Sequence, residues 1–469
     1  MIYFLLRALL RHALQIYFRE VEIEGREDVP AEGPLLLAAN HPNTLIDVLL
    51  VGTCLDRRVG FVAKSTLFRG LAKPLLHFFG AVPVSRRIDG EVDEETRKKN
   101  EQVLAACEDA VARGGAILIF PEGVSQDAPR LLELRTGLAR IALGAERRAP
   151  GRVTIVPVAL AYDDGDTFRS RARVRFAPPI AVAPYRALAD GSPADAHAAA
   201  GPDDRPAGER AATEKAAVRA LTETVRGALE PEVVHVDAAD LDPLLAGLIE
   251  VYGPKVEAEA GGRLAAAVGI ARAVNAFART DPARVARVRG LLDDYRAALA
   301  HAGVTDRAVR SASIRRPRPG EQLAFWLSAP LALWGIAQHL LFYQLPRLAV
   351  RALTQDHLYA STIKLLFGLL ALTACYAVQT WGVRELAGGP AAAVYLGTLP
   401  LSGLVALLWL EGLEARARAR RARAERARLA PAVRTDLEAR RAALVGEVDR
   451  ARAAWTLEQT EQDRPPTEA

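Results

Sequence analysis

The chain has 469 residues, of which half are hydrophobic and a quarter are charged. This balance excludes a disordered chain and a protein made only of membrane helices, and the length favours two or three folded units. The net charge is only +5, but arginines concentrate at Arg315–Arg318 and Arg416–Arg428. The cysteines Cys54, Cys107 and Cys375 lie far apart, without metal-binding spacing. We therefore expect a reducing compartment, no disulfide framework and no metal site.

The first segment, residues 1–20, predicts an amphipathic helix. In "MIYFLLRALLRHALQIYFRE" the polar residues Arg7, Arg11, Gln15 and Arg19 recur every four positions, and apolar residues fill the remaining surface. A secretory signal lacks such a stripe, and no small-residue cleavage site follows. A helix lying on an anionic membrane surface explains the pattern. The alternative is an ordinary helix packed on a core.

Residues 21–185 alternate between strand and helix patterns, which predicts a layered α/β domain. An amphipathic helix is expected in "EETRKKNEQVLAACEDAVARGG". The prolines of "RVRFAPPIAV" place that strand at a sheet edge. The strand segments are "VEIEG", "GPLLLAAN", "RVGFVAK", the end of "LLHFFGAVPVSR", "AILIFPEG", "TIVPVALAY" and "RVRFAPPIAV". Loops at the ends of these strands are available for chemistry.

Three further segments carry no recognisable chemistry. Residues 186–210 are rich in Pro, Gly, Asp and Ala and predict a flexible linker. Residues 211–320 show helical patterns and predict a helical accessory region. Residues 413–469 form a tail of Arg, Ala and Glu, expected to be a charged helix that is solvated or rests on anionic lipid.

Residues 321–412 contain three apolar stretches whose lengths approach the ~20 residues that cross a bilayer. If all three crossed, Arg416–Arg428 would lie on the side opposite the N-terminal part, against the tendency of basic residues to stay inside. We therefore expect transmembrane helices at 363–381 and 391–411, and an interfacial helix at 323–345. Three true spans, or a helical hairpin buried in protein, are the alternative.

Polar residues interrupt the apolar strands at several points in the α/β region. His41 and Asp47 follow "LLLAAN", and Arg86 follows "GAVPVS". Glu122 and Gly123 follow "AILIFP", and the fourth motif is "VPVAL" within the next strand. Each taken alone could be a turn, a cap or a solvated residue. Four such motifs in order within one domain, beside membrane helices, indicate an active site.

The order Asn-His…Asp, Gly-x-x-Pro-Val-x-Arg, Phe-Pro-Glu-Gly and Val-Pro-Val resembles the glycerolipid acyltransferase family, which acylates glycerol-3-phosphate and lysophosphatidic acid. The resemblance covers Tyr17 to Pro184. Five residues separate His41 from Asp47, where the family usually has four. The longer spacing and the Ser-x-Asp after Phe-Pro-Glu-Gly resemble the branch that includes the fungal glycerol-3-phosphate/dihydroxyacetone-phosphate acyltransferases. The stretches "APLALWGIAQHLLFYQLPRLAVRAL" and "STIKLLFG" also resemble the C-terminal part of that branch.

This resemblance implies a membrane-bound O-acyltransferase that moves a fatty acyl group from a thioester to the hydroxyl of glycerol-3-phosphate in phospholipid biosynthesis. Lysophosphatidic acid is the alternative acceptor. His41 would be the general base, and Asp47 would accept the other ring N–H and stabilise the imidazolium. Pro42 and Asn43 can form the turn before the helix, so we expect His41 and Asp47 to be in contact despite the extra residue.

The remaining motif residues would bind substrate. Arg86 would grip the acceptor phosphate. Glu122 would orient acceptor hydroxyls or the arginine, and Gly123 would let the backbone come close. Four further residues are second candidates for the phosphate or for the nucleotide of the donor: Lys64, Arg87, Ser125 and Arg135.

The expected partners are membrane lipids, the phosphorylated acceptor, and acyl-CoA or acyl carrier protein as co-substrate, with no cofactor, metal or nucleic acid. The expected location is the bacterial inner membrane, with the catalytic domain on the cytoplasmic side. A non-catalytic scaffold would be favoured by an altered His41 or Asp47, and both are intact. A hydrolase with a nucleophile elbow would need G-x-S-x-G, which the sequence lacks.

Overall fold

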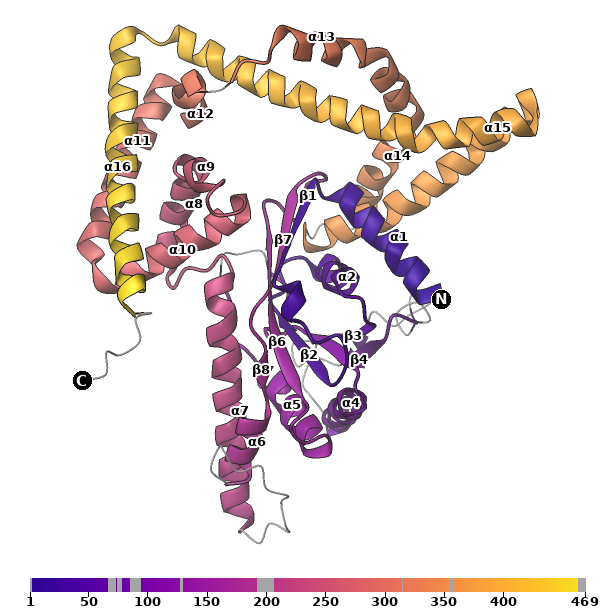
Figure 1. Ribbon diagram of the computed structural model, residues 1–469, viewed down its shortest axis with the longest axis vertical. Helices are drawn as coiled ribbons and strands as arrows, with labels where there is room; N and C mark the ends of the chain where they lie inside the picture. The colour runs from indigo at the N-terminus through magenta and orange to yellow at the C-terminus, as the bar shows by residue number, and fades with distance from the viewer. Residues whose placement is uncertain are drawn as a thin grey trace. The chain divides into compact units, whose positions relative to one another are not determined.

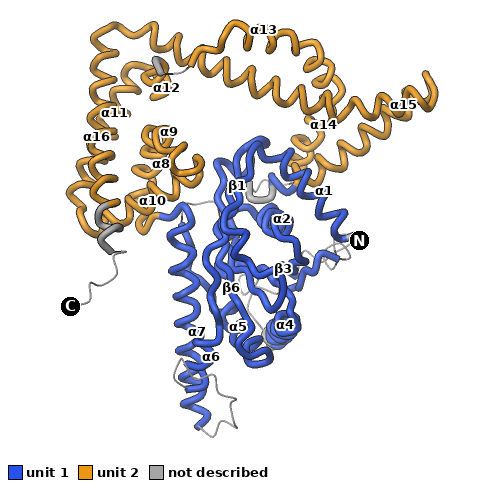
Figure 2. Tube along the Cα trace, viewed as in Figure 1, with its two compact units in different colours: residues 1–235, 356–362 blue, residues 236–355, 363–469 orange. Residues whose placement is uncertain are grey.

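The chain folds into two compact units, shown in different colours in Figure 2. Unit 1 comprises residues 1–235 and 356–362, and unit 2 comprises residues 236–355 and 363–469. The computed structural model (Figure 1) describes the following residues: 2–65, 73, 78–84, 94–126, 130–191, 206–313, 315–353 and 357–462.

Unit 1 is built on one eight-stranded sheet with the order β1-β7-β6-β2-β5-β3-β4, and β8 pairs with β6. The pairs of β6 with β7 and with β8 are antiparallel, and the other pairs are parallel. The strands are β1 (Glu20–Glu24), β2 (Leu35–Ala39), β3 (Val59–Lys64), β4 (Ala81–Val84), β5 (Ala116–Ile119), β6 (Thr154–Tyr162), β7 (Arg171–Phe176) and β8 (Ile180–Ala181). All five residues of β2 are buried, as expected for a central strand covered on both faces.

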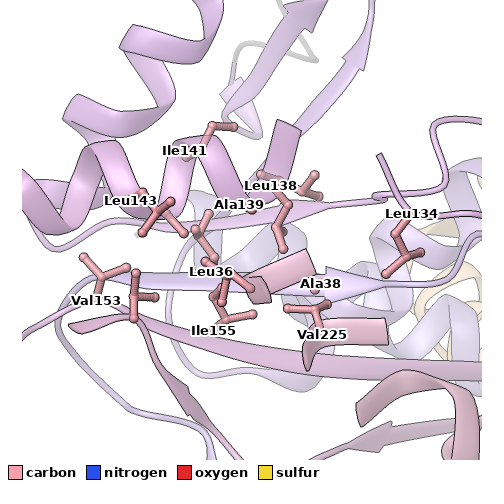
Figure 3. Close-up of a cluster of buried hydrophobic side chains, with 14 of the residues drawn as sticks. Leu36, Ala38, Leu134, Leu138, Ala139, Ile141, Leu143, Val153, Ile155 and Val225 are labelled. Carbon is pink, nitrogen blue, oxygen red and sulfur yellow. The ribbon is translucent and has the colours of Figure 1, made fainter. Parts of the chain in front are cut away.

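Helices cover this sheet. Leu36 of β2 and Ile155 of β6 belong to a core that also includes Leu138 of α5 and Val225 of α7 (Figure 3). The alternate β2 residue Leu37 points to the opposite face and is also fully buried, so the domain has a layer on each side of the sheet. Within the described residues, the α-helices that lie wholly in unit 1 are α1 (Ile2–Tyr17), α2 (Thr44–Cys54), α4 (Glu94–Ala112), α5 (Gly137–Arg148), α6 (Ala183–Ala189) and α7 (Ala207–Leu229).

Two features of unit 1 differ from the expectation. The strand β7 is not at an edge, because it lies between β1 and β6. Its prolines, Pro178 and Pro179, follow the last residue of the strand, where they do not break its pairing. The boundary of the unit falls after residue 235 rather than near 186–210, because α7 buries apolar side chains such as Leu221 against the core of the α/β domain.

The N-terminal helix α1 has one face on unit 1 and one face exposed. Leu14 and Tyr17 are buried, and Arg7 forms an ion pair with Asp56 at 3.0 Å. The polar stripe is thus partly directed at the protein. The exposed large apolar residues of the helix are Phe4, Leu5, Leu9 and Ile16. This apolar face suits a membrane surface, and the interfacial role stays a prediction.

Within its described residues, unit 2 consists of helices and the loops that connect them. Its helices are α8 (Asp242–Val251), α9 (Gly253–Val256), α10 (Arg263–Thr280), α11 (Pro282–Ala302), α12 (Asp306–Val309), α13 (Pro319–Leu327), α14 (Ala329–Leu353), most of α15 (His357–Arg428) and α16 (Pro431–Gln462). The α8, α10 and α11 helices bury Leu248, Ile270 and Tyr295, which gives this unit a core of its own.

The apolar stretches of unit 2 form α13, α14 and α15. Within the described residues one helix, Ala360–Arg428, is long and apolar enough to cross a membrane, and α13 with α14, bent by 42°, could form a second span. In α15 the backbone is non-helical at Gly388, between the predicted spans 363–381 and 391–411. Exposed apolar side chains such as Trp381 suit contact with lipid. The number of crossings stays a prediction.

Candidate active site

The residues of the candidate site lie at the carboxyl ends of three neighbouring strands. Both β5 and β6 pair parallel with β2, so all three strands end at the same edge of the sheet. His41 follows β2 by two residues, Glu122 follows β5 by three, and Tyr162 is the last residue of β6. Parallel α/β sheets commonly bind ligands at this edge.

The structure brings the predicted pair into contact. His41 Nδ1 lies 2.9 Å from Asp47 Oδ2. Asp47 is completely buried, and His41 is 8% exposed. The five intervening residues are accommodated by a turn in which Thr44, the first residue of α2, has a φ of +40°. The additional residue therefore does not separate the acid from the imidazole.

Asp47 is held by two further donors. The Asn43 backbone N–H donates to Oδ2 at 2.7 Å, and the Tyr162 hydroxyl donates to Oδ1 at 2.6 Å. Burial, followed by the nearby Asp47 carboxylate, raises the pKa of Tyr162 well above its ordinary value, so the phenol keeps its proton. Donors around both oxygens orient the carboxylate and satisfy a charge that burial alone would make costly.

Further contacts hold both the ring and the backbone of His41. It stacks on Phe120 with a centroid distance of 3.7 Å and an interplanar angle of 15°. The His41 backbone N–H donates to Glu122 Oε1 at 3.1 Å, and its carbonyl accepts from the Gln126 N–H at 3.1 Å. Because Nδ1 is turned to Asp47, Nε2 is the ring nitrogen with which His41 can take a proton from a substrate.

Glu122 has a structural task. It is 4% exposed, and its second oxygen accepts from the Leu132 N–H at 3.2 Å. Burial raises the pKa of this carboxyl group, while the bonds from Leu132 and His41 act in the opposite direction. The side chain thus ties the loop after β2 to the segment that follows the Phe-Pro-Glu-Gly turn. Its predicted contact with acceptor hydroxyls stays a prediction.

Gly123 and Arg135 lie against each other. Gly123 has a φ of +76°, and a Cβ atom there would lie 2.7 Å from Arg135 Nε. The Arg135 backbone N–H donates to the Pro121 carbonyl at 2.8 Å, which closes the turn. The glycine therefore makes room for the arginine side chain. Ser125 lies half-buried in the same loop.

Three predicted substrate-binding residues cannot be placed. Arg86 and Arg87 lie outside the described residues, as does the side chain of Lys64. The backbone of Lys64 ends β3 and pairs with Val84, the last residue of β4. The substrate-binding roles of Arg86, Arg87 and Lys64 stay predictions.

Two residues at the site were not foreseen. Tyr162 ends the predicted strand "TIVPVALAY", and a polar residue at the end of the strand beside His41 was the available signal. Phe120 opens the Phe-Pro-Glu-Gly motif at the end of a predicted strand, and the sequence assigns it no role in the site. Both contacts join strands far apart in the sequence.

The geometry suits proton transfer by His41 and not a cysteine nucleophile. Burial raises the pKa of Cys54 to about 12 and that of Cys107 to about 11, so neither thiol is ionised near neutral pH. A histidine with Nδ1 on a buried carboxyl group can use Nε2 to activate a hydroxyl group directly.

The family model described as Acyltransferase matches residues 20–161, the segment that contains His41, Asp47, Phe120 and Glu122. Glycerol-3-phosphate O-acyltransferase 1 of Saccharomyces cerevisiae is 28% identical, over 37% of this chain and 34% of that protein. The alpha form of mouse (Mus musculus) 1-acyl-sn-glycerol-3-phosphate acyltransferase is 25% identical, over 38% of this chain and 61% of that protein.

The crystal structure of the 1-acyl-sn-glycerophosphate (LPA) acyltransferase PlsC from Thermotoga maritima is a weaker match. Its sequence identity is 16% and its TM-score is 0.29, over 46% of this chain and 75% of that one. The chain spans about a third of the length of the first curated relatives that it matches, at 37% and 34%. Residues 20–161 of the α/β unit are therefore similar to the Acyltransferase family.

Proposed function

We propose that the protein is a membrane-bound O-acyltransferase that moves a fatty acyl group from a thioester to the hydroxyl of glycerol-3-phosphate. The observation that carries the proposal is the buried pair His41–Asp47, with Nδ1 and Oδ2 at 2.9 Å. The match of residues 20–161 to the Acyltransferase family supports the reaction class.

In the proposed reaction His41 Nε2 takes the proton from the acceptor hydroxyl as its oxygen attacks the thioester carbonyl. The new C–O bond forms, the C–S bond breaks, and the proton on Nε2 passes to the departing thiolate. Asp47 stabilises the imidazolium in between, and the Tyr162 hydroxyl and the Asn43 N–H, which donate to its carboxyl oxygens, hold it in place. No covalent enzyme intermediate is required.

The acceptor is the finer part of the proposal. The names of the yeast relatives support glycerol-3-phosphate, and those of the mouse and bovine relatives support 1-acylglycerol-3-phosphate as the alternative. Either acceptor presents a phosphate, which suits the cationic side chain of Arg86. That residue follows β4 by two positions, and β4 pairs with β3 in the sheet that carries the site. The proposed donor is acyl-CoA or acyl carrier protein, with no further cofactor.

The membrane location is also proposed. The apolar helix Ala360–Arg428 and the exposed apolar face of α1 support attachment to a bilayer. Arginines at 416–428, after the last apolar stretch, favour a cytoplasmic position for the chain on that side. A bacterial inner membrane with unit 1 in the cytoplasm is the specific form of this proposal.

The decisive experiment is acyl transfer by the purified protein in detergent, with wild type compared with His41→Ala. A radiolabelled long-chain acyl-CoA, and separately an acyl carrier protein thioester, would be offered with glycerol-3-phosphate, dihydroxyacetone phosphate or lysophosphatidic acid. Transfer that depends on His41 would establish the reaction and identify the acceptor. Failure of every pair would refute the proposed activity and favour a non-catalytic scaffold.

Arg86→Ala tests the proposed phosphate contact. Loss of a charged hydrogen bond to a phosphate should raise the KM for the phosphorylated acceptor by about 10- to 100-fold, with a smaller effect on kcat. Arg140→Ala, which removes an exposed arginine of α5, serves as the control. An unchanged KM would show that the phosphate binds elsewhere.

A further inference from the structure

The start of α15 lies against the loop that carries His41 and Asp47. Residues 356–362 belong to unit 1, although the remainder of the helix belongs to unit 2. Ser361 is completely buried, and its hydroxyl donates to Asn43 Oδ1 at 2.7 Å. This bond joins residues 318 positions apart in the chain.

Asn43 connects this serine to the catalytic pair. Its backbone N–H donates to Asp47 Oδ2, the same oxygen that lies 2.9 Å from His41 Nδ1. Its side-chain amide donates to the Gly165 carbonyl at 3.0 Å. Asn43 is 2% exposed. The bonds from Ser361 and to Gly165 hold the side chain of Asn43 and so restrain its backbone, and a shift of that backbone would move a donor to the carboxylate that orients the imidazole.

A second contact supports the same loop. The Thr362 hydroxyl lies 3.2 Å from the Thr44 hydroxyl. Thr44 has a φ of +40°, which is unfavourable for a β-branched residue and persists only where the surroundings hold it. Two adjacent hydroxyls of α15 thus contact two adjacent residues of the turn between His41 and Asp47.

We propose that Ser361 is a positioning residue of the active site, which holds Asn43 and thereby the His41–Asp47 pair, with Thr362 as its support. The helix that carries Ser361 continues directly into the apolar segment expected to enter the bilayer. The first residues of this helix, which belong to unit 1, would then complete the active site. This inference rests on the proposed acyl transfer, since the effect on catalysis requires that reaction.

The test compares Ser361→Ala, Ser361→Thr and Ser402→Ala in the full-length protein. Ser402 is a matched control, because it is buried in the same helix and its hydroxyl donates to the Leu399 carbonyl of its own helix at 3.0 Å. We expect Ser361→Ala to lower kcat about tenfold, the effect of one lost positioning hydrogen bond, with both KM values within about twofold. Ser361→Thr should restore much of the loss, and Ser402→Ala should have wild-type kcat.

Double mutants separate positioning from general destabilisation. If Ser361 acts through Asn43, the double variant Ser361→Ala/Asn43→Ala should be no slower than Asn43→Ala alone. Multiplied losses, an unchanged kcat in Ser361→Ala, or an equal loss in Ser402→Ala would overturn the proposal.

Hydrogen exchange provides a readout that is independent of activity. In Ser361→Ala the backbone amides of residues 41–47 should exchange faster than in wild type, while those of β6 should not change. Unchanged exchange in residues 41–47 would refute the contact with Asn43. If the wild type transfers no acyl group, the proposed function fails, and this exchange measurement still decides whether Ser361 holds the loop.

Discussion

The two units each bury a histidine, but only one of these residues is arranged for chemistry. In unit 1, His41 is 8% exposed, and its Nδ1 lies 2.9 Å from the carboxylate of Asp47. In unit 2, His339 is 5% exposed, with Nδ1 2.7 Å from the Gly335 carbonyl and Nε2 2.8 Å from the Tyr376 hydroxyl.

The difference lies in the partners of the two rings. Both nitrogens of His339 bond to neutral groups of the surrounding helices, so this ring joins α14 to α15. Polar side chains commonly have that role between membrane helices. The Nδ1 of His41 contacts the buried carboxyl group of Asp47, an arrangement in which the acid orients the ring and Nε2 can serve a substrate. Burial alone therefore does not identify a catalytic histidine.

Of the variants that test this comparison, His41→Ala should cause the largest loss of kcat. Loss of a general base should reduce kcat by about 10²- to 10⁴-fold with the fold and membrane binding retained. The assay is acyl transfer, with circular dichroism and membrane flotation to check folding and binding. His301→Ala, at an exposed position of α11, is the control and should keep full activity. Near-normal turnover in His41→Ala would show that His41, like His339, has no catalytic role.

Tyr162→Phe should have the next largest effect. It removes a 2.6 Å hydrogen bond to the buried Asp47 carboxylate, which should lower the free energy of unfolding by about 1–3 kcal/mol and reduce kcat by about tenfold. Denaturant titration and steady-state kinetics would measure both quantities. Tyr185→Phe, which removes a hydroxyl bonded to Thr224 at 2.7 Å in the same unit, should not change kcat. Equal kcat in the two variants would show that the phenol does not support catalysis.

Glu122→Gln tests the buried carboxyl that holds the backbone of His41. Because burial raises its pKa in the folded state, the carboxyl stabilises the fold fully below the ordinary glutamate pKa of about 4.3. That contribution is lost as the pH rises through the raised pKa. The Gln variant should be less stable by about 1–3 kcal/mol at low pH, since its amide nitrogen cannot accept a backbone N–H.

The stability difference between wild type and Glu122→Gln should then narrow as the pH rises from the ordinary glutamate pKa. Denaturant titrations at a series of pH values would measure it. Glu146→Gln is a matched control, because Glu146 is buried and accepts from the Val153 N–H at 2.9 Å away from the site. A difference that is constant or widens with pH would contradict the assignment for Glu122.

Tyr376→Phe should have the smallest effect and completes the comparison. Loss of its hydrogen bond to His339 should reduce stability by about 0.6 kcal/mol, and at most about 1.7 kcal/mol, with kcat unchanged. Thermal unfolding in detergent and the acyl transfer assay would measure these effects. A large loss of kcat would mean that the polar contact in unit 2 also serves the reaction.

The sequence by itself determined the alternating strands and helices of unit 1 and the pairing of His41 with Asp47. These features depend on short-range patterns: an apolar strand such as "LLLAA" has to be buried, and two residues that flank one turn lie close whatever surrounds them. Hydropathy likewise located the apolar stretches of unit 2, because the length of a membrane segment can be read along the chain.

Only the tertiary structure decided which distant groups surround this pair. Tyr162, Phe120 and Ser361 reach the site through strand pairing and helix packing over separations of up to 318 residues, which no local pattern encodes. The interior position of β7 and the packing of α7 on unit 1 also depended on neighbours outside their own segments. Local patterns in the sequence therefore identify the reacting groups, His41 and Asp47. Long-range packing determines which donors orient them, because a hydrogen bond depends on position in space and not on position in the chain.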